Sequence, residues 1–393
     1  MSLTTTFAGR RLPLLWLAFR TGLYSVLTLG FYRFWQKTRL RRWYWSAIRP
    51  GGLPLDYVGD PFEKLLGFLI AVVILAFYIG VVNLALMFVS FSLFQGNYAA
   101  YLLSFIGVIP VWFYARYRAR RYILARTRWR GLRFGLAPGA WGYAFRALLY
   151  WALTILSAGL LWPLMTFQLE KYRTNRTWFG DRRFTQGGRW LMLYRSTVWL
   201  WATLVPMVLT LIAIGMGDIV SIIVLSAATG LTAIYGLVYY RVDSLRRLTA
   251  TKQFGNVTLT LNARPLRVLW ITLSGNLIAG LGASIPALFM LGLFLQLQST
   301  ETLVQLGLEN APQLLRDPAT WLLLALTAMS YFAIFLVWGA LRHAFVTLPI
   351  WRHYAEALVI DSAEDLDQLR QRPRDETTQA EGFAEALDVG ASL

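Results

Sequence analysis

The sequence predicts an all-α membrane protein, a polytopic helical bundle with six to eight transmembrane segments. Of its 393 residues, 57% are apolar and only 15% are charged, whereas soluble proteins average about 25% charged residues. The chain has no cysteine and a net charge of +18. This composition excludes a disordered chain, a disulfide scaffold and a soluble globular enzyme.

Eight apolar stretches approach or exceed the roughly 20 residues that a helix needs to cross a bilayer. None alternates apolar and polar residues as a barrel strand does, and a helix satisfies its own backbone amides in lipid. We therefore expect helices at 12–35, 65–94, 98–115, 140–169, 190–215, 218–240, 268–296 and 320–341.

Four connecting segments hold most of the positive charge. They are 36–64, 116–139, 170–189 and 241–267, and the second contains eight arginines and no acid. Lys and Arg accumulate on the cytoplasmic side of a membrane. The sequence therefore predicts a membrane protein with these loops and its C-terminus in the cytoplasm.

This sidedness leaves two apolar stretches, 12–35 and 140–169, alone between basic segments. A single crossing by either would place a basic loop outside. We favour re-entrant or interfacial segments, each broken at a matching place, over eight ordinary spans with one loop that violates the charge rule. The predicted breaks lie at Gly30 in the first stretch and at Gly159 and Pro163 in the second.

The organisation looks internally repeated. A broken apolar segment, a basic-aromatic segment and a helical pair occur in 1–139 and again in 140–267, before a helical pair at 268–341 and an acidic tail at 342–393. A weaker echo of the break is Gly282 with Pro286. Trp129-x-Gly131 is echoed by Trp178-x-Gly180, which suggests short hairpins on the cytoplasmic surface.

Three motifs resemble the YjgN-like inner-membrane proteins of bacteria, a family of unknown function. The first is Thr28-Leu-Gly-Phe-Tyr-Arg-Phe-Trp-Gln-Lys-Thr-Arg-Leu-Arg-Arg-Trp-Tyr-Trp45. The others are Asp56-Tyr57-Val58-Gly59 and the tail segment Glu381-Gly382-Phe383. The resemblance implies an inner-membrane location and supplies no catalytic residues. It also suggests a membrane-associated metallopeptidase as a protein partner.

Arginine outnumbers lysine 34 to 4, which suits bidentate contact with phosphate. In a soluble protein such arginine-aromatic segments would indicate nucleic-acid binding. Between membrane segments we expect anionic lipid headgroups or a protein partner instead, and no nucleic acid. The candidate residues are Arg41, Arg42, Arg116, Arg118, Arg120, Arg121, Arg126, Arg128, Arg130, Arg133, Lys171 and Arg173.

Two arginines, Arg20 and Arg146, lie inside the broken apolar stretches. A charge in hydrocarbon is costly, so it snorkels to the surface or faces a cavity. The two arginines are therefore candidates for an anion-attracting cavity, with the mid-span amides Asn83 and Asn276 as further candidates. Amides of this kind are more often hydrogen-bond partners between helices.

No motif for catalysis, metal or cofactor binding is present, and the two histidines, His343 and His353, lack zinc-ligand spacing. We expect a non-enzymatic accessory protein; the alternative is a transporter or channel with a cavity near Arg20 and Arg146. The acidic tail is either a solvated end or folds back on the arginine-rich surface. The sequence leaves homo-oligomerisation open.

Overall fold

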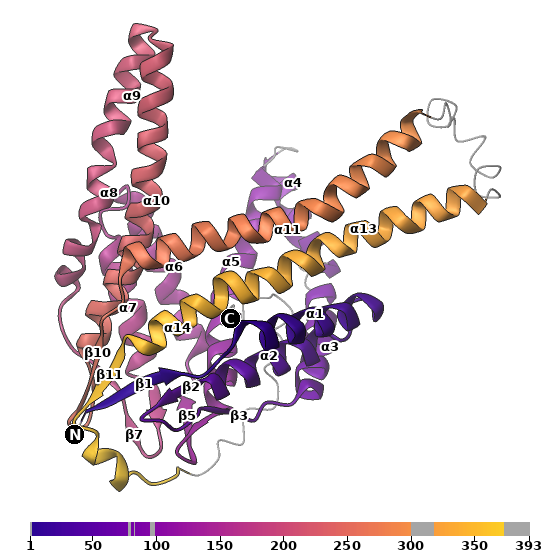
Figure 1. The fold of residues 1–393 in the computed structure, drawn as a ribbon. Helices are drawn as coiled ribbons and strands as arrows, with labels where there is room; N and C mark the ends of the chain where they lie inside the picture. The colour runs from indigo at the N-terminus through magenta and orange to yellow at the C-terminus, as the bar shows by residue number, and fades with distance from the viewer. Residues whose placement is uncertain (1, 78–79, 82, 95–98, 300–317, 373–393) are drawn as a thin grey trace. The chain divides into compact units, whose positions relative to one another are not determined.

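The computed structural model describes residues 2–77, 80–81, 83–94, 99–299 and 318–372, and its elements are mostly helical (Figure 1). The chain divides into two compact units. Unit 1 comprises Met1–Ala8, Arg41–Arg267 and His353–Leu393, and unit 2 comprises Gly9–Leu40 and Val268–Arg352.

Four helical stretches in the described residues are long and apolar enough to cross a membrane: Trp190–Met216, Ile219–Ala250, Pro265–Leu295 and Trp321–Glu356. They confirm four of the predicted segments. The elements that form them are η2 (Trp190–Thr197), α8 (Val198–Ala202), α9 (Leu204–Met216), α10 (Ile219–Ala250), α11 (Pro265–Ser299), α13 (Pro318–Arg342), η4 (His343–Thr347) and α14 (Leu348–Glu356).

The short turn between α9 and α10 shows why this helical pair reverses direction. Gly217 ends α9 in the left-handed conformation, with φ of 71°, and the side chain of Asp218 then accepts a hydrogen bond from the backbone N–H of Ser221. A left-handed glycine after a helix and an aspartate before the next are ordinary stop and start signals. Hydrogen bonds from the Ser221 hydroxyl and then from its backbone N–H lower the pKa of the exposed Asp218 carboxyl.

The helices predicted at 65–94 and 98–115 are observed as α3 (Pro61–Phe77), α4 (Asn83–Phe94) and α5 (Ala99–Ala125). They are not among the four stretches that meet the length and hydropathy needed for crossing. The connections at 78–79, 82 and 95–98 lie outside the described residues.

A break follows the first helix of each isolated apolar stretch, at the predicted place, although the helix after the first break lies mostly in the basic segment 36–64, which was predicted as a loop. The helix pairs are α1 (Arg11–Leu27) with α2 (Arg33–Ala47), and α6 (Ala140–Leu156) with α7 (Trp162–Thr174). At the breaks φ is 93° at Gly30 and 88° at Gly159, a region that glycine enters without steric cost. By contrast, α11 runs uninterrupted through Gly282 and Pro286, so the break predicted there is absent. A proline removes only one hydrogen bond from a helix.

The all-α prediction was wrong, because the described chain also contains eleven short strands (Figure 1). One sheet has the order β2-β1-β11-β10-β9-β8 and the other β3-β4-β5-β6-β7. The strands are β1 (Leu3–Phe7), β2 (Ile48–Pro50), β3 (Asp56–Tyr57), β4 (Thr127–Trp129), β5 (Leu132–Leu136), β6 (Thr177–Phe179), β7 (Arg182–Arg183), β8 (Thr185–Gln186), β9 (Lys252–Phe254), β10 (Val257–Leu261) and β11 (Leu358–Asp361).

These two sheets, here called the strand module, collect all four basic segments. Strands β2 to β10 lie in those segments, and β1 and β11 are added from the ends of the chain. The hairpins predicted at Gly131 and Gly180 are present as β4–β5 and β6–β7, each with a positive-φ glycine in a two-residue loop. This loop geometry matches the twist of the paired strands.

Each of the five helical segments in the described chain starts and ends on strands that pair with each other. Antiparallel pairs join β1 to β2, β3 to β4, β5 to β6, β8 to β9 and β10 to β11. The chain therefore leaves a sheet, passes through helices and returns to the neighbouring strand of the same sheet.

A five-residue strand followed by a helix start occurs three times along the chain with the same internal spacing. The strand β1 with the helix start at Arg11 is followed 129 residues later by β5 with the helix start at Ala140, and 254 residues from the first by β10 with Pro265. Equivalent backbone hydrogen bonds close the three strand pairs: Ala8 N to Ala47 O, Ala137 N to Arg176 O, and Asn262 N to Ala357 O. The elements β5–α6–α7–β6 follow one another at the same spacing as β1–α1–α2–β2, without an insertion.

An aromatic core fills the space between the two sheets. Trp129 and Phe179 come from the five-stranded sheet, and Phe254, Val257 and Ile360 come from the six-stranded sheet. The Phe179 ring lies 5.6 Å from that of Trp129 and 5.9 Å from that of Phe254. Large aromatic rings supply much of the apolar area in a small core, so the two sheets are one packed body.

The described part of the tail folds back on this module. The short helix η5 (Ala363–Gln368) adds Leu366 to the aromatic core. Asp367 pairs with Arg130 at 2.9 Å, and Asp365 lies 3.8 Å from Arg182. Of the two alternatives for the tail, residues 358–372 follow the docked one; the segment Glu381-Gly382-Phe383 lies outside the described residues.

Candidate functional site

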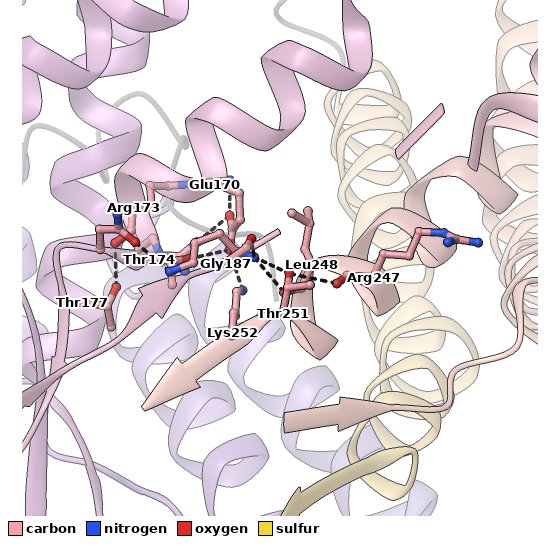
Figure 2. Close-up of polar contacts among 12 residues, drawn as sticks. Glu170, Arg173, Thr174, Thr177, Gly187, Arg247, Leu248, Thr251 and Lys252 are labelled. Carbon is pink, nitrogen blue, oxygen red and sulfur yellow. Dashed lines mark hydrogen bonds and ion pairs between the residues drawn. The ribbon is translucent and has the colours of Figure 1, made fainter. Parts of the chain in front are cut away.

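A buried glutamate organises the basic residues around the end of α7 (Figure 2). The Glu170 carboxylate is 11% exposed and lies 2.7 Å from Lys252 Nζ and 2.6 Å from an Nη of Arg173. Arg120 lies 4.0 Å from it. Lys252 begins β9, so this cluster fastens α7 to the six-stranded sheet.

Two opposing effects set the pKa of Glu170 in this cluster. Burial disfavours the carboxylate, but the charges of Lys252, Arg173 and Arg120 and the Lys252 hydrogen bond outweigh that cost. They hold the pKa of Glu170 well below its ordinary range. A buried charge persists only when it is paired and hydrogen-bonded in this way, so the cluster is a structural element of the module.

Two further acids also bind basic residues, one of them exposed (Glu63) and one buried (Asp243). Glu63 accepts a 2.8 Å hydrogen bond from Nε of Arg126, whose guanidinium also stacks 3.8 Å from the Tyr122 ring. Asp243, 2% exposed, is bound by Arg246 and Arg247 and accepts a 2.7 Å hydrogen bond from Ser196. These carboxylates neutralise part of the basic charge internally.

The predicted headgroup-binding residues therefore differ in their surroundings. Three are buried: Arg41, which donates to the Tyr57 hydroxyl at 3.2 Å, Arg121 and Arg126. Exposed or half-buried are Arg42, Arg116, Arg118, Arg120, Arg128, Arg130, Arg133, Lys171 and Arg173. Arg173 and Arg120 belong to the Glu170 cluster.

Arginines and aromatic rings alternate where α5 and α6 meet, here called the α5–α6 belt. Arg116 lies over the Trp112 ring at 5.4 Å, and Arg118 donates to the Tyr114 hydroxyl at 3.1 Å. The Tyr114 ring lies 4.7 Å from that of Trp141, which is 52% exposed. Exposed tryptophans beside arginines are typical of a membrane–water interface.

The residues predicted to line an anion-attracting cavity are placed on separate helices. Arg20 on α1 is exposed and lies 6.0 Å from the Tyr24 ring, within unit 2. Arg146 on α6, within unit 1, is also exposed and donates to Gly142 O at 3.0 Å. Asn276 donates to Thr272 O within its own helix, and Asn83 begins α4.

A cavity of about 200 Å³ opens on the strand module, beside the end of α5. Its lining includes five arginines and one acid: Arg121, Arg126, Arg128, Arg133, Arg372 and Glu63. We call it the arginine cavity. Four of these arginines, all except Arg372, belong to the predicted headgroup set, and the strand register and the position of α5 bring them together.

A family model described as a bacterial protein of unknown function (DUF898) matches residues 2–386. The chain belongs to this family. The match extends over both sheets and every described helix, in accord with the resemblance found at Thr28–Trp45. Comparison with curated proteins and with solved structures gives no match.

Sequence reasoning missed the acids that hold the module together. Glu63, Glu170 and Asp243 lie in or beside the basic segments, where they counted only as minor reductions of positive charge. Glu170 and Asp243 are buried, and Glu63 binds Arg126 from a distant part of the chain; these contacts depend on how the elements pack. A detectable signal was Glu170-Lys-Tyr-Arg173, where an acid and a cation three residues apart share a helix face.

Proposed function

We propose that this protein is a multi-pass inner-membrane protein that engages anionic phospholipids from the cytoplasmic side as a non-enzymatic accessory. The α5–α6 belt is the observation that carries the proposal. It combines exposed Trp112 and Trp141 with Arg116 and Arg118 at the end of an apolar helix. Each basic residue near a membrane surface contributes about 1 kcal/mol of attraction to anionic lipid.

The sidedness in this proposal is supported by strand pairing. Because each helical segment returns to the strand beside the one it left, it crosses a membrane either twice or not at all. The stretches 12–35 and 140–169 then no longer place a basic loop outside, because α1–α2 and α6–α7 are re-entrant or interfacial hairpins. All four basic segments share one side, which the charge rule assigns to the cytoplasm.

In the accessory role, exposed arginines of the strand module bind a membrane-protein partner. Arg49 on β2 and Arg183 on β7 are exposed and point away from the aromatic core. A partner with an acidic cytoplasmic surface would complement them.

The lipid proposal is tested by native mass spectrometry of the full-length protein extracted from membranes containing phosphatidylglycerol and cardiolipin. We expect the wild type to retain anionic lipids and Arg116→Gln/Arg118→Gln to lose about tenfold or more in retention, since two contacts of about 1 kcal/mol are removed. Arg49→Gln/Arg183→Gln is the matched control with the same charge change and should retain the lipids. Equal retention by both variants would refute the assignment of lipid binding to the belt.

A further inference from the structure

Helix α1 of the α1–α2 hairpin lies along the long apolar helix α13 within unit 2. A Cβ added at Gly22 of α1 would lie 2.6 Å from Leu336 Cδ1 of α13. Arg11, at the start of α1, lies 5.7 Å from the Phe345 ring, just beyond the end of α13. The two helices are antiparallel, because a later residue of α1 meets an earlier residue of α13. In the multi-pass arrangement proposed above, α1 therefore enters the bilayer beside α13 from the cytoplasmic side.

This packing sets the depth of Arg20 relative to Arg342, the first charged residue after the apolar stretch of α13. Leu336, which meets Gly22, lies six residues before Arg342. Arg20 lies two residues before Gly22 and is therefore about four residues deeper than Arg342, or roughly 6 Å at the rise of an α-helix. Side chains on a helix point toward its N-terminus, which for α1 is the cytoplasmic end. The Arg20 guanidinium is thus directed toward the lipid headgroups.

Helix α2 brings a second arginine, Arg39, back to about the same depth. Gln36 of α2 lies opposite Gly22 of α1, with its Nε2 3.4 Å from a Cβ built at Gly22. From this contact, Arg39 is three residues toward the cytoplasm on α2, and Arg20 is two residues toward it on α1. The two arginines are therefore level to within about one helical turn.

A pair of tyrosines connects the two arginines. The rings of Tyr24 on α1 and Tyr32 on α2 are 5.2 Å apart. Arg20 lies 6.0 Å from the Tyr24 ring, and Arg39 lies 5.6 Å from the Tyr32 ring. A cation within about 6 Å of an aromatic ring is attracted to its face, and a stacked arginine keeps N–H donors at its edge. The tyrosines thus hold both guanidinium groups beside one surface of the hairpin.

Neither arginine has a counter-charge in the part of the chain that the structure describes. Residues 9–40 contain no acid, and neither Arg20 nor Arg39 has an ion pair or a side-chain hydrogen bond with another described residue. The acids of unit 2 lie in residues 301–317, which precede α13, whereas α1 packs against the last turns of that helix. A charge at the edge of the hydrocarbon is costly without a partner, so this surface attracts an anion.

The exposed face of α1 is apolar on both sides of Arg20. Trp16, Leu23 and Leu27 are exposed, and with Arg20 and Tyr24 they follow the spacing of one helix face. The two leucines continue from the level of the arginines toward the tip of the hairpin. A phospholipid whose phosphate met the arginines would lay an acyl chain along these leucines. This surface therefore suits a lipid better than a free phosphate ion.

We propose that the α1–α2 hairpin binds one anionic phospholipid of the cytoplasmic leaflet, with the lipid phosphate held by Arg20 and Arg39 and an acyl chain along Leu23 and Leu27. Arginine suits phosphate because its planar fork donates two parallel hydrogen bonds. The site rests on the proposed function for its membrane insertion and its leaflet. It is distinct from the α5–α6 belt, whose helices belong to unit 1.

The test is photo-crosslinking of the full-length protein in phosphatidylcholine nanodiscs that contain phosphatidylglycerol with a diazirine in its acyl chain. Crosslinks on the peptides of α1 and α2 are quantified by mass spectrometry as the fraction of this probe is raised. We expect saturable labelling of the wild type. Arg20→Gln/Arg39→Gln should need about tenfold or more probe for half-saturation, because each basic contact with anionic lipid is worth roughly fivefold in binding.

A charge-matched control separates this site from general attraction to the membrane surface. Arg10 and Arg342 are also exposed arginines of unit 2, and Arg10→Gln/Arg342→Gln should be labelled as the wild type is. All four side chains are replaced at exposed positions, so both variants should fold, which a thermal scan confirms. Equal weakening by the two variants, or labelling of the wild type that does not saturate, would overturn the proposal.

Competition identifies the class of lipid. Unlabelled phosphatidylglycerol should displace the probe from the hairpin, and unlabelled phosphatidylethanolamine, which carries no net charge, should not. Equal displacement by the two lipids would refute a site for anionic lipid.

The belt is measured in the same experiment on the peptides of α5 and α6. Arg116→Gln/Arg118→Gln should weaken labelling there and leave labelling of the hairpin unchanged, so the failure of one site is seen separately from the failure of the other. In native mass spectrometry the hairpin accounts for one retained lipid, and the belt is assessed on the lipids beyond it.

Discussion

Replacing Glu170 with glutamine removes the carboxylate that holds the clustered basic side chains at the end of α7. Lys252 and Arg173 are only 15% and 20% exposed and lie 2.7 Å and 2.6 Å from it. Without the carboxylate they become buried cations with no counter-charge. Removing one partner from a buried ion pair costs about 3–5 kcal/mol, so Glu170→Gln should lower the stability of unit 1 by that amount.

The effect is measured by thermal unfolding of the purified protein. At about 2–4 °C per kcal/mol for a body of this size, we expect a decrease in Tm of roughly 6 °C or more. Asp367→Asn is the control: its ion pair with Arg130 is also short, at 2.9 Å, but the Asp367 side chain is 72% exposed, and such surface pairs contribute about 0–1 kcal/mol. If both variants shift Tm equally, burial does not set the strength of these contacts and the reasoning fails.

Three further predictions concern titration, the helix breaks and helix packing. Because the folded-state pKa of Glu170 lies below its ordinary value, its stabilisation is present above about pH 4.3 and is lost as pH falls through the folded pKa. The Tm difference between wild type and Glu170→Gln should therefore be constant from pH 6 to 8 and shrink below pH 4; a difference unaffected by acid would contradict the assignment. At Gly159, where φ is 88° and an added Cβ meets no atom within 4 Å, alanine should cost about 1–2 kcal/mol and asparagine less, because only the backbone conformation is strained. Equal thermal stability of the alanine, asparagine and wild-type proteins would exclude a required left-handed turn. In α11, a Cβ at Gly275 would lie 2.7 Å from Val346 Cγ2, whereas one at Gly292 meets nothing within 4 Å. Gly275→Ala should thus lower Tm, and Gly292→Ala should leave it unchanged or raise it slightly, with the opposite order refuting the close approach.

The helices and their breaks could be predicted because their signals are local. Apolar length marks the four long stretches, and Thr28-Leu-Gly30 and Ser157-Ala-Gly159 place a hydroxyl before a glycine. In the structure Thr28 Oγ1 accepts from Tyr32 N, and Ser157 Oγ accepts from Leu161 N. Side chains of this kind compete with helical hydrogen bonds.

The sheets could not be predicted in the same way. The strands are two to five residues long, too short for a period of two to stand out among arginines. Their partners lie far apart, as in the pairing of Leu3 with Ile360. Only the hairpin loops at Gly131 and Gly180 carry a local signal, and these were the parts predicted.

At the candidate site, too, the local signals could be predicted and the long-range contacts could not. The arginines of the cavity were identified as candidates from composition, since residues 116–133 are dense in them. The register of β4 and β5 places Arg128 opposite Arg133. The docking of α5 brings Arg121 and Arg126 to the same cavity. Trp178 was predicted only as part of a hairpin motif, and Arg372 entered no prediction, because their places at the cavity depend on pairing with β5 and on the folded-back tail.

The most direct test of the central claim, that paired strands gather all four basic segments on the cytoplasmic side, is cysteine labelling in intact cells. The native chain has no cysteine, so single cysteines at the exposed positions Arg49, Arg130, Arg183 and Asn256 can each be treated with an impermeant maleimide. A cysteine at Met216, 78% exposed beside the α9–α10 turn, provides the external reference. The account predicts labelling of position 216 from outside and of the other four only after the inner membrane is permeabilised. Labelling of any of the four from outside would contradict it.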